Sequence, residues 1–376
     1  MVKQVCIIGG GNIGITCAVD ISLNKNYKVS LLTKKAALLP DQLKIHDTES
    51  NTDRVSNSVT ITDDENVALK ECDIVIVTVP SFLTESTVKQ IAPFKPEIVF
   101  FFPGYGGKEF FSKILIEQDI IIAGLERVPY IARLDSDFTA NSSKKKELAC
   151  AAVNSKNTEY ACSLIEEFFN IPCKRINNYL TISLTPSNPI LHTARLYSLF
   201  NKYDFNSELP RQIKFYAEWD DFSSETLIGM DCELEGICKK LSSIDLSQFK
   251  TIREHYESFD IKAMTNKITS IPAFKNILSP LIKSGEDTSF KIDSESRYFK
   301  EDFMYGLCNL KGLADLAGIE TPYMNKVLKW YSSISGLDLL DKNNKITGKD
   351  ISKTGIPQIF GIDSISKIND FYNKGR

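Results

Sequence analysis

The chain has 376 residues, of which 43% are hydrophobic and 25% are charged, and its formal net charge at pH 7 is −3. This length is sufficient for two domains of ordinary size, and the composition is that of a globular protein. The slightly acidic balance gives no electrostatic reason to expect nucleic acid or an anionic membrane as a partner, and no apolar run is long enough for a membrane span.

Nine cysteines are dispersed along the chain without a C-x-x-C pair. Such an odd, scattered set predicts neither a disulfide framework nor a zinc site, so we expect no metal and a reducing compartment. The first residues already read as a strand and a glycine turn, which leaves no room for a signal peptide. We therefore expect a cytoplasmic protein. The sequence leaves its oligomeric state open, with a homodimer among the alternatives.

The most informative motif follows the first predicted strand. An apolar run at 5–8 leads directly into G-x-G-x-x-G at 9–14, and a helix-compatible stretch comes next. Gly9 allows the tight turn, Gly11 lets the backbone approach a pyrophosphate, and Gly14 lets the helix pack closely. Backbone N–H groups at the helix start would hold the phosphates. The predicted cofactor-binding residues here are Gly9, Gly11, Asn12, Ile13 and Gly14.

The end of the next predicted strand, 27–32, indicates which dinucleotide is bound. An NAD enzyme usually carries an acidic residue there, which accepts a hydrogen bond from the ribose 2′-hydroxyl. This chain has Thr33, Lys34 and Lys35 instead, and the first acid is Asp41. A hydroxyl and two ammonium groups suit a 2′-phosphate, although two exposed lysines in a loop are also an ordinary surface feature. The position favours NADP(H), with NAD(H) as the alternative.

Strands and helices alternate up to about residue 180. The near-continuous apolar run at 73–79 is typical of a parallel strand that is covered on both faces. Alternation of this kind predicts a doubly wound, Rossmann-type parallel sheet, whose ligand lies at the carboxyl ends of the strands, near the glycine loop and Pro80. Further predicted strands cover 58–61, 98–102, 120–123 and 148–153, and further helices cover 85–92, 108–117 and 158–169.

Beyond about residue 180 the strand signals fade, and apolar residues recur at helical spacing in 196–202, 216–240, 302–317 and 323–334. The sequence therefore predicts an α/β protein with a dinucleotide-binding domain over 1–182. A mostly helical substrate and catalytic domain follows over 183–376.

His192 stands out among the three histidines because it opens the second half of the chain. Asn188 can cap a helix whose first residue is Pro189, which places His192 in the first turn. A helix terminus disfavours imidazolium and suits a proton-exchanging group. A lone histidine is usually structural, but this one lies where a cleft between two domains is expected.

A second polar cluster contains Arg297 and Asp302. The two residues could form an exposed ion pair of little energetic weight. Alternatively, Arg297 could bind a substrate carboxylate through both arms of its guanidinium, and Asp302 could orient an imidazole. The residues alone leave both readings open.

Several motifs together resemble the opine (octopine/nopaline) dehydrogenase family over most of the chain, to about residue 335. The resemblance rests on the glycine fingerprint, Glu126–Arg133, Leu180–Leu184 leading to N-P-x-x-H at 188–192, Arg297–Leu307, and Ala317–Pro322. It implies that His192 is the catalytic acid/base, that Asp302 is its catalytic partner, and that Arg297 binds a carboxylate. Two positions depart from the family pattern: Thr193 replaces a frequent proline, and the acidic residue typical of NAD enzymes is missing.

The resemblance implies an oxidoreductase that condenses an α-keto acid with an amino acid at the expense of NAD(P)H and yields an opine. Two alternatives stay open at this point. One is an NADP-dependent reductase of hydroxy or keto acids with the same two-domain architecture, and the other is a non-catalytic nucleotide sensor. Small-molecule substrates are the expected partners.

Overall fold

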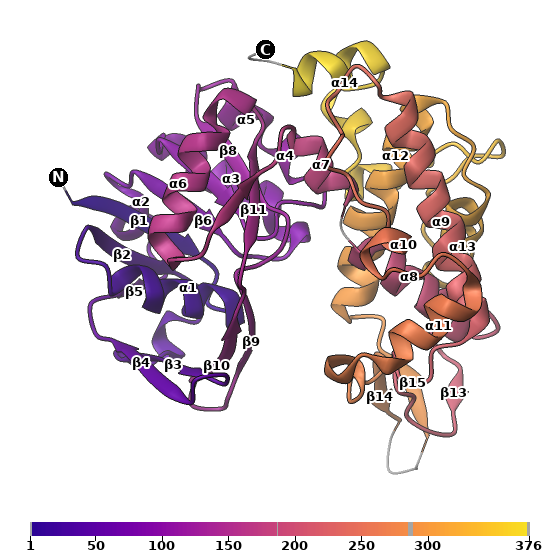
Figure 1. The fold of residues 1–376 in the computed structure, drawn as a ribbon, viewed down its shortest axis with the longest axis horizontal. Helices are drawn as coiled ribbons and strands as arrows, with labels where there is room; N and C mark the ends of the chain where they lie inside the picture. Colours follow the sequence, from indigo (N-terminus) through magenta and orange to yellow (C-terminus); the bar gives the residue numbers. More distant parts are fainter. Residues whose placement is uncertain (1, 186, 285–288, 374–376) are drawn as a thin grey trace. The chain divides into compact units, whose positions relative to one another are not determined.

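The computed structural model describes residues 2–185, 187–284 and 289–373 and divides the chain into two compact units (Figure 1). The first unit runs from the N-terminus to Ser183 and also takes in the chain from Asp370 onward, while the second comprises Leu184–Asn369. The sequence-based division at 182/183 contains no such return of the chain. The return depends on contacts between residues that are far apart in sequence.

An eight-stranded sheet forms the centre of the first unit, as predicted. Its described neighbours pair in parallel except β11 and β8, which are antiparallel. The order reverses at β1, which lies between β2 and β6, and doubly wound sheets bind ligands at such a switch point. In spatial order the strands are β12 (Cys173–Arg175), β11 (Leu148–Ala152), β8 (Ile121–Leu125), β7 (Ile98–Phe101), β6 (Ile74–Val77), β1 (Lys3–Ile8), β2 (Tyr27–Leu32) and β5 (Thr60–Thr62).

The predicted helices of this unit are present, although the one expected over 108–117 is divided at Ser112 into α4 and α5, and α7 was not predicted. Asp64 caps α2 by accepting a hydrogen bond from the backbone N–H of Asn66, 2.8 Å away. The core lies between the sheet and its helices, where Phe168 of α6 packs edge-on against Tyr27 at 5.0 Å between ring centroids. The helices are α1 (Asn12–Ser22), α2 (Glu65–Leu69), α3 (Thr84–Ile91), α4 (Lys108–Phe111), α5 (Lys113–Ile116), α6 (Thr158–Phe169) and α7 (Tyr179–Leu184).

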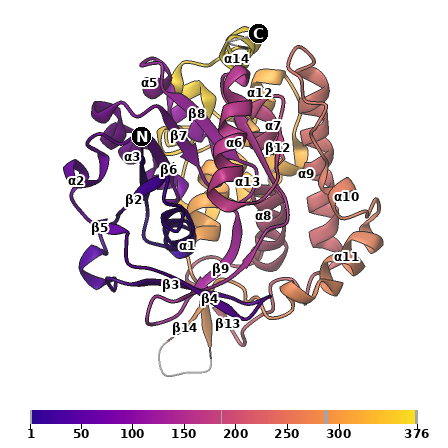
Figure 2. The ribbon, with the colours of Figure 1, turned by 60° about the vertical axis from the view of Figure 1, so that its left-hand side comes forward.

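A smaller four-stranded sheet, which the sequence analysis does not predict, contacts α1 and lies below it in both ribbon views (Figures 1 and 2). Its strands are β4 (Thr52–Ser56), β3 (Leu43–Asp47), β10 (Ala140–Lys144) and β9 (Tyr130–Leu134), in that order. The strand β10 reads Ala-Asn-Ser-Ser-Lys. Such a polar strand gives little hydrophobic alternation for a sequence reading to detect.

The last helix, α14 (Ile365–Tyr372), ends in the core of the first unit. The hydroxyl of Tyr372 donates to Oε1 of Glu109 over 2.8 Å, and the hydroxyl of Ser183 donates to the same oxygen. Glu109 is fully buried, and burial raises the pKa of its carboxyl to about 7. Ser183 is the last residue before the chain leaves the first unit, and Tyr372 follows soon after the chain returns at Asp370. Both residues therefore lie close in sequence to a crossing between the units, and both donate to the carboxyl group of Glu109.

The second unit is mostly helical, as predicted. Helices α8, α9 and α13 contact one another, and the short sheet β13-β15-β14 lies at the lower end of the unit in Figure 1. None of the described helices is both long and apolar enough to span a membrane. The elements are α8 (Ser187–Phe200), β13 (Glu208–Leu209), α9 (Asp221–Lys240), α10 (Ile252–His255), α11 (Ile261–Ser270), β14 (Leu281–Lys283), β15 (Phe290–Ile292), the π-helical segment η6 (Tyr298–Leu307), α12 (Cys308–Ala317) and α13 (Pro322–Ser335).

Candidate active site

The glycine loop lies at the switch point of the large sheet, between β1 and α1. Gly9 has a φ of +121°, a conformation that residues with a side chain rarely adopt. A Cβ atom at Gly14 would lie 1.7 Å from the carbonyl oxygen of Gly9, whereas one at Gly11 would meet no atom within 4 Å. The third glycine is therefore needed for the fold, and the space over Gly11 is open to a ligand.

The start of α1 carries Asn12 and Ile13, both half-buried. The side-chain oxygen of Asn12 accepts a hydrogen bond from the backbone N–H of Leu134 over 3.2 Å, which ties the helix start to β9. No acidic residue occurs in the first helical turn. The positive end of the helix dipole is thus not offset there by a neighbouring carboxylate of the same turn.

The residues after β2 and β6 adjoin this loop. Thr33 is buried, and its hydroxyl oxygen accepts from the backbone N–H of Lys35 over 3.2 Å. Lys34 and Lys35 are exposed. Pro80 is half-buried after β6, where the hydroxyl of Thr78 donates to the carbonyl oxygen of Gly9 over 3.2 Å. The predicted cofactor-binding residues thus gather around the carboxyl ends of β1, β2 and β6.

His192 lies in the second turn of α8. The expectation of a helix capped by Asn188 is wrong, because α8 already begins at Ser187. The first-turn effect on the imidazole is correspondingly weaker, since the influence of the dipole falls off within the terminal turn. The proton chemistry of His192 must therefore be set by its side-chain neighbours.

Both ring nitrogens of His192 have partners. Nδ1 is 2.8 Å from Oδ2 of Asp302, and Nε2 is 2.8 Å from the hydroxyl of Tyr216. The side chains of His192 and Asp302 are only 12% and 10% exposed. The ring of Tyr298 packs edge-on against the imidazole, with 4.6 Å between centroids. The imidazole is held on both edges and on one side.

Burial raises the pKa of Asp302, and the adjacent imidazole of His192 opposes this rise. The carboxyl group reaches His192 because η6 packs closely on α8. A Cβ atom at Gly306 would lie 2.8 Å from Cβ of Pro189, so only glycine allows this approach. π-Helical segments often occur at functional sites, and here η6 carries the partner of the candidate acid/base.

Arg297 is placed differently from the other two predicted residues. Its Nε donates to Oε2 of Glu301 over 2.8 Å, and its side chain is 71% exposed while that of Glu301 is 9% exposed. The guanidinium is close enough to lower the pKa of Asp302 slightly. The structure thus joins His192 to Asp302 and pairs Arg297 with Glu301.

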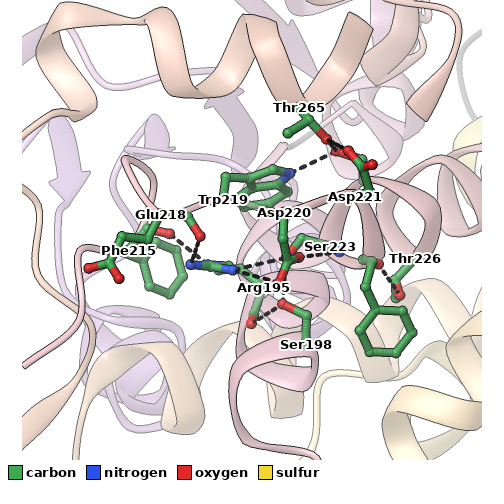
Figure 3. A network of polar contacts seen from close by, with 12 residues as sticks. Arg195, Ser198, Phe215, Glu218, Trp219, Asp220, Asp221, Ser223, Thr226 and Thr265 are labelled. Atoms are coloured by element: carbon green, nitrogen blue, oxygen red, sulfur yellow. Dashed lines mark hydrogen bonds and ion pairs between the residues drawn. The ribbon is translucent and has the colours of Figure 1, made fainter. Parts of the chain in front are cut away.

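Two further residues of this site are absent from the sequence-based prediction. Tyr216 was expected inside a helix over 216–240, but α9 begins at Asp221 because Asp220 caps it, accepting from the backbone N–H of Ser223 over 2.7 Å. Arg195, one turn after His192, is buried and bonds to the segment before this cap (Figure 3). The capping signal of Asp220 could have moved the helix start; nothing local indicates the role of Arg195.

Within the described residues, no cluster of three or more histidine, cysteine, aspartate or glutamate side chains could hold a metal ion. The cysteines are all free. The side chains around His192 supply carboxylate, phenol and guanidinium groups.

Comparisons with known proteins match both halves of the chain. A family model described as "NAD/NADP octopine/nopaline dehydrogenase, alpha-helical domain" matches residues 175–335, and one described as "Ketopantoate reductase PanE/ApbA" matches residues 5–147. Octopine dehydrogenase of Pecten maximus is 24% identical over 98% of this chain and 99% of its own. Tauropine dehydrogenase of Arabella iricolor is 25% identical over 96% and 98%.

The fold also matches a solved structure over its whole length. Octopine dehydrogenase in complex with NADH and L-arginine superimposes with a TM-score of 0.86 at 23% identity, covering 100% of this chain and 98% of that one. Similarity of this extent in both units, together with the helical-domain model that covers His192, Arg297 and Asp302, agrees with the motifs read from the sequence. The chain is thus similar over nearly its whole length to members of the opine dehydrogenase family.

Proposed function

We propose that this protein condenses an α-keto acid with an amino acid and reduces the product with NAD(P)H to an opine, a secondary amine with two carboxylates. The observation that carries the proposal is the buried pair of His192 and Asp302, 2.8 Å apart, in the helical unit of an opine dehydrogenase. Condensation needs a group that both takes and gives a proton near neutral pH, and imidazole is suited to this.

A nicotinamide dinucleotide fits the first unit. The open space over Gly11 admits a pyrophosphate, and the backbone N–H groups at the start of α1 can hold it. When bound, the cofactor supplies a hydride. We propose a preference for NADP(H), because Lys34 and Lys35 are exposed at the end of β2, where a 2′-phosphate would lie. NAD(H) is the alternative.

The acid/base work is assigned to His192. The amine of the amino acid attacks the keto carbon, a C–N bond forms, and the nitrogen loses a proton to the imidazole. The same imidazole returns this proton to the former carbonyl oxygen, which becomes a hydroxyl group. The imidazole then passes on a second proton from solvent, so that water leaves and the nitrogen lone pair closes a C=N bond. Asp302 stabilises the imidazolium between these two transfers and fixes the orientation of the ring.

Arg297 is assigned to the carboxylate of the keto acid. A guanidinium can present two parallel N–H groups to the two oxygens of a carboxylate. In the structure, Nε and Nη2 of Arg297 both donate to the single oxygen Oε2 of Glu301. The substrate would compete with Glu301 for the exposed guanidinium. Such a clamp fixes which face of the keto carbon is presented for reduction.

A second candidate is a reductase of keto acids that needs no amine, which the ketopantoate reductase model over residues 5–147 favours. Oxidation of NADPH should be followed at 340 nm (the usual cofactor band), with pyruvate and other keto acids, across a panel of amino acids. Opine formation requires both substrates together. Oxidation with the keto acid alone would establish the second candidate, and no oxidation with any pair would indicate a protein that only binds nucleotide.

A further inference from the structure

Tyr216 is positioned on the nitrogen of His192 that points away from Asp302. The Tyr216 ring is 4% exposed and stacks on Phe274, with 4.1 Å between centroids and 19° between ring planes. Burial raises the pKa of its phenol well above the ordinary value, which is reinforced by the nearby Tyr298. The phenol is therefore protonated at neutral pH, and its O–H is available to donate to Nε2 of His192.

The segment that carries Tyr216 is fastened by Arg195 (Figure 3). Nε of Arg195 donates to the carbonyl oxygen of Phe215 over 2.7 Å, and Nη2 donates to that of Glu218 over 2.5 Å. These two carbonyls lie immediately before Tyr216 and two residues after it. A single guanidinium thus brackets the tyrosine along the backbone.

Arg195 is itself held firmly. Its Nη1 donates to the hydroxyl of Ser223 over 3.1 Å and lies 3.6 Å from a carboxylate oxygen of Asp220, the cap of α9. The side chain is 1% exposed, and burial lowers the pKa of the guanidinium to about 10, so it stays charged at neutral pH. The planar fork matches three acceptors at once, which a lysine ammonium would not reproduce.

The directions of these hydrogen bonds define a tautomer. An ionised Asp302 can only accept, so Nδ1 of His192 carries the proton that it receives. A protonated phenol donates to Nε2, which is then the unprotonated nitrogen of a neutral imidazole. We propose that Tyr216, held in place by Arg195, reinforces the tautomer of His192 that Asp302 selects, so that Nε2 is the nitrogen that accepts a proton.

This inference rests on the proposed role of His192 as the acid/base. A substrate amine is also an N–H donor, so it takes the place of the phenol hydrogen bond on Nε2 and meets that nitrogen already in its unprotonated form. Tyr216 and Arg195 act through His192 and are positioning residues. Their loss should lower turnover while leaving cofactor affinity unchanged, since the cofactor-binding residues belong to the first unit.

The tautomer can be observed directly by nitrogen NMR of protein labelled with ¹⁵N-histidine. Only three histidines are present, and His46→Gln and His255→Gln assign the other two. At about pH 8, where an ordinary imidazole is neutral, we expect the signals of a protonated Nδ1 and a free Nε2 for His192. A protonated Nε2 in the parent protein would overturn the proposal, whether or not the protein makes opines.

Tyr216→Phe keeps the stacked ring and removes only the donor. We expect the Nε2 signal of His192 to move and kcat to fall roughly tenfold, with an unchanged KM for NADPH, as for the loss of one buried hydrogen bond. Arg195→Lys should shift the same signal in the same direction. Tyr197→Phe and Arg253→Lys are the matched controls and should alter neither quantity.

If Arg195→Lys does not fold, Tyr216→Phe decides the matter alone. An unchanged Nε2 signal and an unchanged kcat in Tyr216→Phe would refute the inference. Failure of the parent protein to use any amine would refute the proposed function instead, and the NMR result would still stand on its own.

Discussion

The imidazole of His192 and the carboxylate of Asp302 lie 2.8 Å apart, although 110 residues separate them in the chain. The contact is made possible by the close packing of η6 on α8 at Gly306 and Pro189. A largely buried carboxylate at this distance fixes the orientation of the imidazole. We therefore expect substitution of either residue to lower turnover, for different reasons.

Replacing His192 by alanine should lower turnover by about two to four orders of magnitude, the usual effect of removing a general acid/base. Asp302→Asn should also impair turnover, because an amide neither stabilises imidazolium nor reliably selects one tautomer. Affinity for NADPH should barely change in either variant. The exposed pair of His46 and Asp53, also 2.8 Å apart, supplies the control His46→Ala. Near-parent turnover in His192→Ala would contradict the assignment.

Arg297→Lys should act mainly on the keto acid. A point charge does not reproduce a two-armed guanidinium, so we expect its KM to rise roughly tenfold, about 1.4 kcal/mol, with a smaller change in kcat. Steady-state kinetics with both substrates varied would measure the split. Arg175→Lys, at an exposed arginine that pairs with Glu159 in the first unit, is the control. A loss confined to kcat would place Arg297 outside the keto-acid site.

The cofactor preference should follow Lys34 and Lys35. We expect NADPH to bind more tightly than NADH, and the difference should shrink as salt rises because exposed charges are screened. Changing both lysines to aspartate should reverse the order by repelling the 2′-phosphate. Fluorescence titration with both cofactors would measure the affinities. Equal affinities in the parent protein would end the argument for NADP(H).

Two glycines of the loop should respond in opposite ways to the same added methyl group. Gly14→Ala places Cβ against the carbonyl oxygen of Gly9 and should destabilise the fold by about 3 kcal/mol or more. Gly11→Ala meets no atom within 4 Å, so the free energy of unfolding should hardly change while cofactor affinity falls. Thermal unfolding and cofactor titration of both variants separate the two effects. Parallel behaviour of the two would contradict this division.

Stability should depend on pH through Glu109. The folded-state pKa, about 7, is above the unfolded value, because burial disfavours the carboxylate. The contribution of Glu109 to the free energy of unfolding is therefore fully present below about pH 4.3. It is lost as pH rises through about 7, by up to about 3 kcal/mol. Glu109→Gln should remove this dependence, and the exposed Glu117→Gln should retain it. Urea unfolding between these pH values would measure the difference.

The architecture of the large sheet could be predicted because its strands are apolar and its helices have clear periodicity. The smaller sheet was missed because strands such as β10 carry mainly polar residues and are specified by pairing with distant segments. The cap at Asp220 was available in the sequence but was outweighed by the apolar spacing over 216–240. The apolar spacing therefore predicted a start of α9 at residue 216, several residues before its actual start at Asp221.

The site was accessible from sequence only in part. Family motifs singled out His192 and Asp302, whose proximity in the structure depends on one glycine, Gly306. Tyr216 and Arg195 were not predicted from the sequence. Their importance lies in hydrogen bonds, those of Arg195 to backbone carbonyls and that of Tyr216 to a ring nitrogen. Neither kind of contact leaves a characteristic spacing in the chain.

The burial of Tyr372 has a consequence for synthesis on the ribosome. This side chain is 1% exposed, packs edge-on against Phe110 at 6.1 Å between centroids, and hydrogen-bonds to Glu109. N-terminal domains ordinarily fold first while the rest of the chain is still being made. Here the first unit lacks part of its interior until the segment that carries Tyr372 has been made. The nascent chain therefore carries an unfinished first unit while the whole of the second unit, Leu184–Asn369, is being made.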